Sequence, residues 1–250
     1  MNSIRDKCAL VTGGGTGIGR SCSILLAQHG AKVVVSDVND AEGQKTVALI
    51  EAAGGTAKYI HCDVSVQEQV KNMVKEAVST FGPVKLALNN AGIGGDMAPI
   101  HEIDMNVWNK IIAVNLTGVM YCMQEELKVM LATGGGSIVN VASLAGVGGT
   151  PMMSPYGVSK HGVVSLTKSG AIEYGKYNVR INAICPSWIE TPILDGFDRE
   201  LLDKQVKRMI PMKRIGEPEE VAETVLWLLS DKASYINGHS MHIDGGLRAR

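Results

Sequence analysis

A tyrosine and a lysine lie four residues apart in the stretch SPYGVSK at 154–160. A serine followed by a proline is typical of a helix start, so we expect Ser154 to be the N-cap and Tyr156 and Lys160 to share one helix face. The pKa of a phenol is ordinarily about 10, and a base that works near neutrality needs a value roughly two to three units lower. A neighbouring ammonium group favours the phenolate. The pair therefore fits a general acid–base that takes or returns a hydroxyl proton.

Five glycines occur within eight residues of the stretch TGGGTGIGRS at 12–21. A P-loop would need a lysine where Arg20 stands, and the dinucleotide pattern G-x-G-x-x-G fails in every register. The spacing that fits is G-x-x-x-G-x-G, formed by Gly13, Gly17 and Gly19. A glycine-rich turn between a strand and a helix leaves backbone amides and a helix N-terminus free to bind a pyrophosphate. The turn thus predicts a dinucleotide site, although such a turn also has purely structural uses.

Asp37 ends the apolar run 33–37, eighteen residues after Gly19. A carboxylate at this place can accept hydrogen bonds from the ribose diol of an adenosine. It would also repel a 2′-phosphate, and neither Thr16 nor Val38 supplies a cation to neutralise one. These residues favour NAD over NADP.

Short β-branched runs alternate with helical segments along the chain, which positions these residues. We expect strands at 9–11, 32–36, 57–61, 86–89, 137–141, 180–184 and 240–243, and helices at about 18–29, 41–53, 67–80, 106–131, 155–176 and 218–229. The alternation predicts an α/β Rossmann fold, a doubly wound parallel seven-stranded sheet with helices on both faces. Ligands of such sheets bind beyond the carboxyl ends of the strands. The segment 190–215 breaks the pattern and is either a substrate flap or an ordinary pair of surface helices.

The totals fit a single domain over 1–250, without a linker or an internal repeat. With 24 Lys+Arg against 25 Asp+Glu, a nucleic-acid surface is not expected. Five scattered cysteines without a C-x-x-C motif and the lack of a targeting or membrane segment predict a reduced, cytoplasmic protein. We expect no metal site, because His61, Cys62 and Asp63 are consecutive and point to alternate faces of a strand.

The motifs together resemble the short-chain dehydrogenase/reductase family from about residue 5 to residue 248. TGGGTGIG looks like its TGxxxGIG signature, NNAG at 89–92 stands as in the family, and Asn115, Ser143, Tyr156 and Lys160 fall on its catalytic positions. Two positions depart from it: Ser187 follows Pro186 where the family has glycine, and Lys85 opens the fourth strand where the family has aspartate. The resemblance implies that Ser143 holds the substrate oxygen, Lys160 anchors the nicotinamide ribose and Asn115 holds a water that relays protons.

The resemblance also implies the cofactor and substrate contacts. The expected cofactor-binding residues are Gly13, Thr16, Gly17, Ile18, Gly19, Asp37, Val38, Asp63, Val64, Asn90, Ala91, Gly92, Tyr156, Lys160, Ile189 and Thr191. The expected substrate contacts are Ser143, Met153, Tyr156 and Trp188, within an apolar wall that adds Met97, Ala145, Met152, Ile193, Leu194 and Phe197. A wall of this kind predicts a hydrophobic, even cyclic, secondary alcohol or its ketone.

Members of the family are usually homotetramers, formed through the helices near 106–131 and 155–176 and the last strand. Val163, Val164, Leu166 and Ile172 are compatible with that role or with the core. Three other functions stay open: an NADPH-dependent 3-oxoacyl-carrier-protein reductase, a P-loop nucleotide hydrolase and a non-catalytic dinucleotide sensor. The reductase is disfavoured by Asp37 and the P-loop hydrolase by Arg20. The sensor is disfavoured by the complete set of Ser143, Tyr156 and Lys160.

Overall fold

The computed structural model describes residues 2–249, and its seven strands form one parallel sheet in the order β3-β2-β1-β4-β5-β6-β7. The strands are β1 (Cys8–Thr12), β2 (Lys32–Asp37), β3 (Thr56–His61), β4 (Val84–Asn89), β5 (Gly136–Val141), β6 (Val179–Pro186) and β7 (Ser240–Ile243). All seven expected strands are confirmed, and the order reverses between β1 and β4. That reversal is where a doubly wound sheet opens a crevice for ligands.

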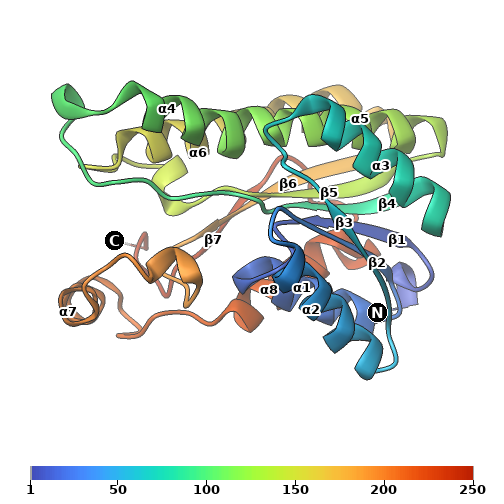
Figure 1. The fold of residues 1–250 in the computed structure, drawn as a ribbon, viewed down its shortest axis with the longest axis horizontal. Coiled ribbons are helices and arrows are strands. Elements are labelled where there is room, and N and C mark those ends of the chain that lie inside the picture. Colours follow the sequence, from blue (N-terminus) through green and yellow to red (C-terminus); the bar gives the residue numbers. More distant parts are fainter. Residues whose placement is uncertain (1, 250) are drawn as a thin grey trace.

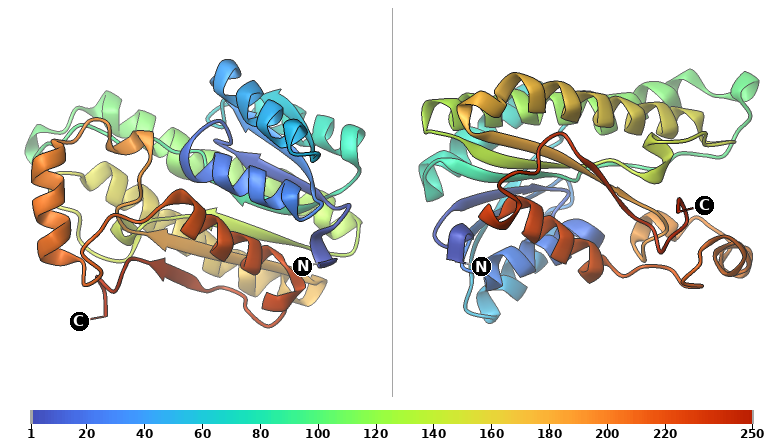
Figure 2. Two further views of the ribbon diagram at one scale, coloured as in Figure 1. Left: turned by 90° about the horizontal axis from the view of Figure 1, so that it is seen from below. Right: turned by 180° about the vertical axis from the view of Figure 1, so that it is seen from behind.

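Helices cover both faces of the sheet (Figure 1). One layer holds α3 (Gln67–Phe81), α4 (Met105–Ile112), α5 (Gly118–Ala132) and α6 (Ser154–Tyr174), and the other holds α1 (Gly17–Gln28), α2 (Asp40–Ala52) and α8 (Pro218–Leu229). In Figure 2, α7 (Arg199–Met209) stands beside the carboxyl ends of the strands, apart from both layers. None of the helices in the described residues combines the length and the apolar character that a membrane span needs.

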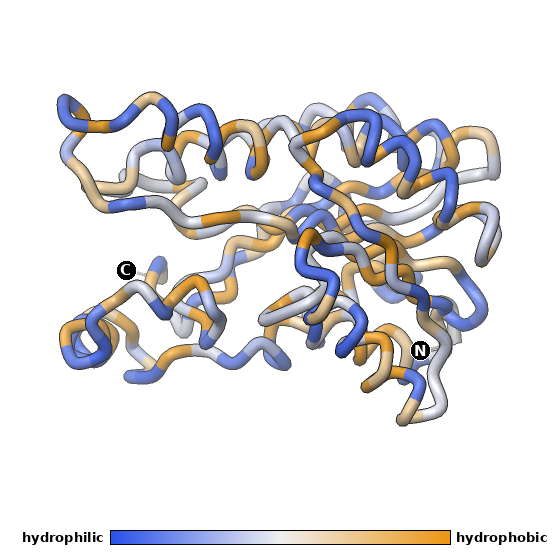
Figure 3. The backbone as a smooth tube through the Cα atoms, viewed as in Figure 1, coloured by the Kyte–Doolittle hydropathy of each residue, from blue (hydrophilic) through white to orange (hydrophobic). Residues whose placement is uncertain are grey.

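The strand side chains alternate between two cores. Leu10 and Val34 belong to the cluster under α3, α5 and α6, whereas Ala9, Val11 and Val33 belong to the cluster under α1 and α8. Successive side chains of a strand point to opposite faces, so a strand covered on both sides is apolar throughout. The hydropathy of the chain follows this, with apolar residues concentrated in the central strands (Figure 3).

The expectation of one continuous helix over 106–131 is wrong. A π-helical turn at Ala113–Thr117 separates α4 from α5. The wider turn holds Asn115, whose buried side chain bonds to the loop after β4. Inserted turns of this type are frequent at functional sites, and hydrophobic spacing does not reveal them.

The segment 190–215 forms a short 3-10 turn at Pro192–Leu194 followed by α7. Leu194, Leu202, Val206 and Ile210 are buried in a small cluster of their own, separate from the two main cores. Asp198 caps α7 by accepting hydrogen bonds from the amides of Glu200 and Leu201. The segment is therefore a locally packed unit beyond the carboxyl end of β6, and its role as a flap stays a prediction.

Candidate active site

The glycine turn after β1 packs tightly against the loop after β4. Gly13 and Gly17 have left-handed φ angles of 60° and 49°. A Cβ on Gly13 would lie 2.8 Å from Cα of Ala91, and one on Gly19 would lie 2.0 Å from the carbonyl oxygen of Gly13. Thr16 is the N-cap of α1 but makes no side-chain capping bond, so the first-turn amides remain available to an anion. This cradle fits a pyrophosphate.

Asn90 and Thr12 join the ends of β4 and β1. Nδ2 of Asn90 donates to the carbonyl oxygens of Thr12 (3.0 Å) and Gly13 (2.9 Å). In return, Oγ1 of Thr12 accepts from the amides of Asn90 (3.0 Å) and Ala91 (3.1 Å). Thr12 was not among the expected site residues, although it opens the glycine motif. It positions the cradle through its hydroxyl group.

Two backbone amides fix the carboxylate of Asp37. Its Oδ2 accepts from the amide of Gly15 and its Oδ1 from the amide of Asn39, each at 2.9 Å. Asp63 follows the neighbouring strand β3, and its Oδ1 accepts from the amide and the hydroxyl of Ser65. Val64 is buried in the core against Gly118, whose Cβ would lie 2.8 Å from Cγ2 of Val64. The side chain of Val64 therefore packs in the core and gives the site structural support.

Tyr156 and Lys160 lie in the first two turns of α6, as expected, but the helix begins one residue early. Ser154 is its first residue and Met153 is the N-cap, without a side-chain capping bond, so the N-cap assignment to Ser154 is wrong. Pro155 at the second position fixes the helical φ angle there. Nζ of Lys160 donates to the carbonyl oxygen of Val141 at 2.8 Å and lies 5.6 Å from the ring centre of Tyr156.

The pKa values of these groups are shifted by burial. Burial lowers the pKa of Lys160 to about 8. Burial raises the pKa of Tyr156, and a hydrogen bond with Ser143, just after β5, opposes that rise. Shifted titrating groups that gather at a strand edge are typical of acid–base catalysis.

Asn115 connects the π-helical turn to the loop after β4 and to α6. Its Nδ2 donates to the carbonyl oxygen of Ile93 (2.9 Å) and to Oγ of Ser159 (3.3 Å), and its Oδ1 accepts from the amide of Ile93 (2.8 Å). A Cβ on Gly92 would lie 3.4 Å from Oδ1 of Asn115 and 3.5 Å from Nζ of Lys160. Gly92 therefore brings the asparagine and the lysine together around one open position.

Comparisons with known proteins agree with this geometry. A family model described as enoyl-(acyl carrier protein) reductase matches residues 13–248. Cyclohexanol dehydrogenase from Acinetobacter sp. (strain SE19) is 43% identical over 249 residues, which cover 100% of this chain and 98% of that protein. Cis-4-hydroxycyclohexanecarboxylate dehydrogenase from Sinomonas cyclohexanicum is 38% identical over 98% of this chain and 97% of that protein. The crystal structure of levodione reductase superposes with a TM-score of 0.95 at 37% identity, over 98% of this chain and 99% of that one.

This chain belongs to the short-chain dehydrogenase/reductase family. It is an oxidoreductase acting on CH–OH groups, and the family implies a nicotinamide dinucleotide as its cofactor. The expected catalytic set of the family, Ser143, Tyr156, Lys160 and Asn115, converges here beyond the carboxyl ends of β4 and β5.

The residues expected to form the apolar substrate wall differ in their burial, and their contact with a substrate stays a prediction. Trp188 and Phe197 stack edge to face at 5.4 Å and, with Leu194, pack into the cluster of the 190–215 segment. Met97 and Ile193 are exposed. At the base of the same segment, Ile189 is buried, and Cγ2 of Thr191 lies 2.9 Å from where a Cβ on Gly17 would be. The segment thus contacts the glycine cradle directly.

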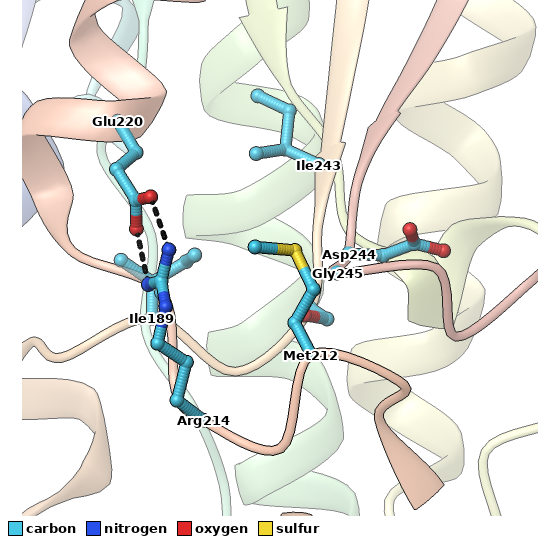
Figure 4. Close-up of a pocket in the computed structure, with 9 residues that line it drawn as sticks. Ile189, Met212, Arg214, Glu220, Ile243, Asp244 and Gly245 are labelled. Carbon is cyan, nitrogen blue, oxygen red and sulfur yellow. Dashed lines mark hydrogen bonds and ion pairs between the residues drawn. The ribbon is translucent and has the colours of Figure 1, made fainter.

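Ser187, which replaces the family glycine, lies on a small pocket of about 120 Å³ between the ends of β6 and β7 (Figure 4). Arg214 and Glu220 border this pocket and are joined by two hydrogen bonds of 2.7 and 2.6 Å. Neither Tyr156 nor Ser143 lines it. The serine is accommodated there, with its amide donating to the carbonyl oxygen of Ile243 at 3.0 Å.

Proposed function

We propose that this chain is an NAD(H)-dependent dehydrogenase that interconverts a hydrophobic, cyclic secondary alcohol and its ketone, with Tyr156 as the general acid–base. The observation that carries the proposal is the convergence of Tyr156, Ser143 and Lys160 beside a glycine cradle that fits a dinucleotide. The ring substrates named for cyclohexanol dehydrogenase and cis-4-hydroxycyclohexanecarboxylate dehydrogenase support a cyclic substrate.

The residues divide the chemistry between them. Tyr156 takes the proton of the substrate hydroxyl during oxidation and returns it during ketone reduction, and Ser143 holds the substrate oxygen by a hydrogen bond. Lys160 favours the phenolate by its charge and would hold the nicotinamide ribose, and Asn115 would hold a water that relays the proton. When bound, NAD supplies the hydride acceptor for oxidation. Met153 and Trp188 would contact the substrate ring.

The choice of NAD rests on Asp37. Its carboxylate is held by two amides at the end of β2, where it can accept hydrogen bonds from a ribose diol. The remaining contacts of the cofactor would come from Thr16, Ile18, Gly19, Val38, Asp63, Asn90, Ala91, Ile189 and Thr191. We further infer a cytoplasmic homotetramer, and the five free, buried cysteines favour a reducing compartment.

The test is the reduction of NAD⁺ or NADP⁺ at 340 nm with a panel of secondary alcohols that includes cyclohexanol and a charged sugar phosphate. We expect turnover of the cyclic alcohol with NAD⁺, and its loss by about a thousandfold in Tyr156→Phe, because the base is removed. The variant should still bind NADH. A preference for NADP⁺ would contradict the role of Asp37, and equal turnover of the sugar phosphate would contradict the apolar substrate.

A further inference from the structure

Two acidic residues approach the same glycine of the cradle. A Cβ on Gly15 would lie 2.8 Å from Oδ2 of Asp37 and 3.2 Å from Cβ of Glu42. Asp37 ends β2, whereas Glu42 lies in the first turn of α2. Glu42 is therefore close to the position where Asp37 would bind the adenosine ribose.

Arg20 is held by Glu42 and its neighbour Thr46. Nη2 of Arg20 donates to Oε2 of Glu42 at 2.5 Å and to the carbonyl oxygen of Glu42 at 3.3 Å, and Nε donates to Oγ1 of Thr46 at 3.0 Å. Thr46 is fully buried and its hydroxyl lies 3.3 Å from the carbonyl oxygen of Gly15. The side chains of Arg20 and Glu42 are 21% and 34% exposed, so the ion pair is partly accessible to solvent. The guanidinium of Arg20, beside the cradle, is thus already hydrogen-bonded within the protein.

The N-terminus of α2 would by itself attract a phosphate, but its own carboxylates oppose one. Asp37, Asp40 and Glu42 fall within six residues. Asp40 is bound by the hydroxyl of Tyr59 and by Nδ1 of His61, at 2.6 and 2.7 Å. Each of the two helix carboxylates thus has a partner, and neither partner is free for a ligand.

We propose that the Arg20–Glu42 ion pair is a second determinant of cofactor choice: Glu42 holds the guanidinium that would otherwise bind the 2′-phosphate of NADP. The inference rests on the proposed function, since it explains how an NAD enzyme excludes NADP. Asp37 would bind the ribose diol and would also repel a 2′-phosphate, so it affects the affinity for both cofactors. Glu42 would affect only the binding of a 2′-phosphate, because it acts by holding Arg20. Its replacement therefore changes the affinity for NADPH and leaves the affinity for NADH unchanged.

The experiment measures the dissociation constants of NADH and NADPH by fluorescence titration of the full chain, without substrate. In Glu42→Gln we expect NADPH to bind about tenfold more tightly, equivalent to about 1.4 kcal/mol, while NADH changes by less than about twofold. Asp37→Asn should weaken NADH as well as tighten NADPH. Glu51→Gln, at the exposed far end of α2, is the matched control and should change neither constant.

The variant Arg20→Met/Glu42→Gln tests the released guanidinium itself. We expect it to lose the gain for NADPH, and Arg20→Lys/Glu42→Gln to keep part of it. A gain that survives without Arg20 would overturn the proposal and assign the effect to lost repulsion or to Lys45, the other cation near Glu42. Far-UV circular dichroism shows whether each variant is folded. If the wild type prefers NADPH, the proposed function fails; if it prefers NADH and Glu42→Gln changes nothing, only this inference fails.

Discussion

At the scale of single residues, Tyr156 is subject to two opposing influences. Burial raises its pKa, and the hydrogen bond with Ser143 lowers it. Lys160 favours the phenolate by its charge, but burial has lowered the pKa of this lysine to about 8, so its charge fades above that pH. The base form of Tyr156 is therefore sensitive to every polar group that touches it.

We predict that Ser143→Ala shifts the rising limb of the kcat/KM profile for alcohol oxidation to higher pH. Oxidation needs the phenolate, and the variant removes the bond that lowers the pKa of Tyr156, so a higher pH is required to form it. We also expect kcat to fall on the order of a hundredfold, because the substrate oxygen loses a donor. Initial rates of NAD⁺ reduction between pH 6 and about 10 provide the profile. An unchanged limb with only a lower plateau would contradict a contribution of Ser143 to the ionisation of Tyr156.

The residue types of this site could be predicted, but their mutual contacts could not. The spacing of Tyr156 and Lys160 predicts a shared helix face, and the structure confirms that the two side chains are neighbours. Nothing in the sequence shows that Gly92 opens a space between Asn115 and Lys160, because these positions come from three separate segments. Thr12 was missed for the same reason: its hydroxyl acts on a loop nearly eighty residues away.

At the scale of elements, α5 and β4 are joined by a buried polar network. Nδ2 of Asn89 donates to Oε2 of Glu126 (3.1 Å) and to Oδ1 of Asn140 (3.0 Å), and Nδ2 of Asn140 donates to Oγ1 of Thr167 (2.9 Å). Among the described residues, Oε1 of Glu126 and Oδ1 of Asn89 are buried without a hydrogen-bond partner. Burial raises the pKa of Glu126 to about 7. A proton on this carboxyl group would suit its surroundings better than a charge.

We predict that Glu126→Gln makes the protein more stable at pH 8 and flattens the pH dependence of its stability. The folded pKa of Glu126 lies above its ordinary value of 4.5, so the folded state binds the extra proton and the wild type loses stability as pH rises from about 4.5 to about 7. Ionisation costs about 3 kcal/mol at most, and a neutral glutamine, which has an N–H donor to offer, avoids it. Urea denaturation at pH 5 and pH 8 measures the difference, with the exposed Glu173→Gln as control. A variant less stable than the wild type at both pH values would show that the carboxylate is well satisfied.

The π-helical turn between α4 and α5 marks where prediction from hydrophobic spacing ends. The hydrophobic pattern over 106–131 is continuous and predicts a regular helix. Such a pattern does not show that a polar side chain, here that of Asn115, lies in a wider π-helical turn. The start of α6 was misplaced by one residue, because Ser154 has the residue type of an N-cap yet lies inside the helix after Met153. Both errors involve only a few residues, and both fall beside the expected catalytic residues. At such sites, local sequence preferences are often overridden by the geometry that the site requires.

At the scale of the whole molecule, the parallel, doubly wound sheet followed from the alternation of strands and helices, whereas the division between core and surface did not. Val163 and Val164 were compatible with an oligomer interface, and the structure places both in the core of the single chain. Ile172, on the same helix, is 85% exposed. A 3.6-residue period separates the faces of a helix, but it does not say which apolar positions pack in the core of one chain and which remain exposed.

The predicted assembly can be tested at this exposed position. We expect light scattering to give a mass near four times the 26.6 kDa of one chain. Ile172→Asp should lower that mass, because a charge buried in an interface without a partner costs several kcal/mol, while no core contact of the single chain is lost. Leu49→Asp, at a half-exposed position on α2 in the opposite helix layer, is the control and should leave the mass unchanged. A wild-type mass of 26.6 kDa would exclude the tetramer, and an unaltered mass for Ile172→Asp would place any interface on other elements than the second half of α6.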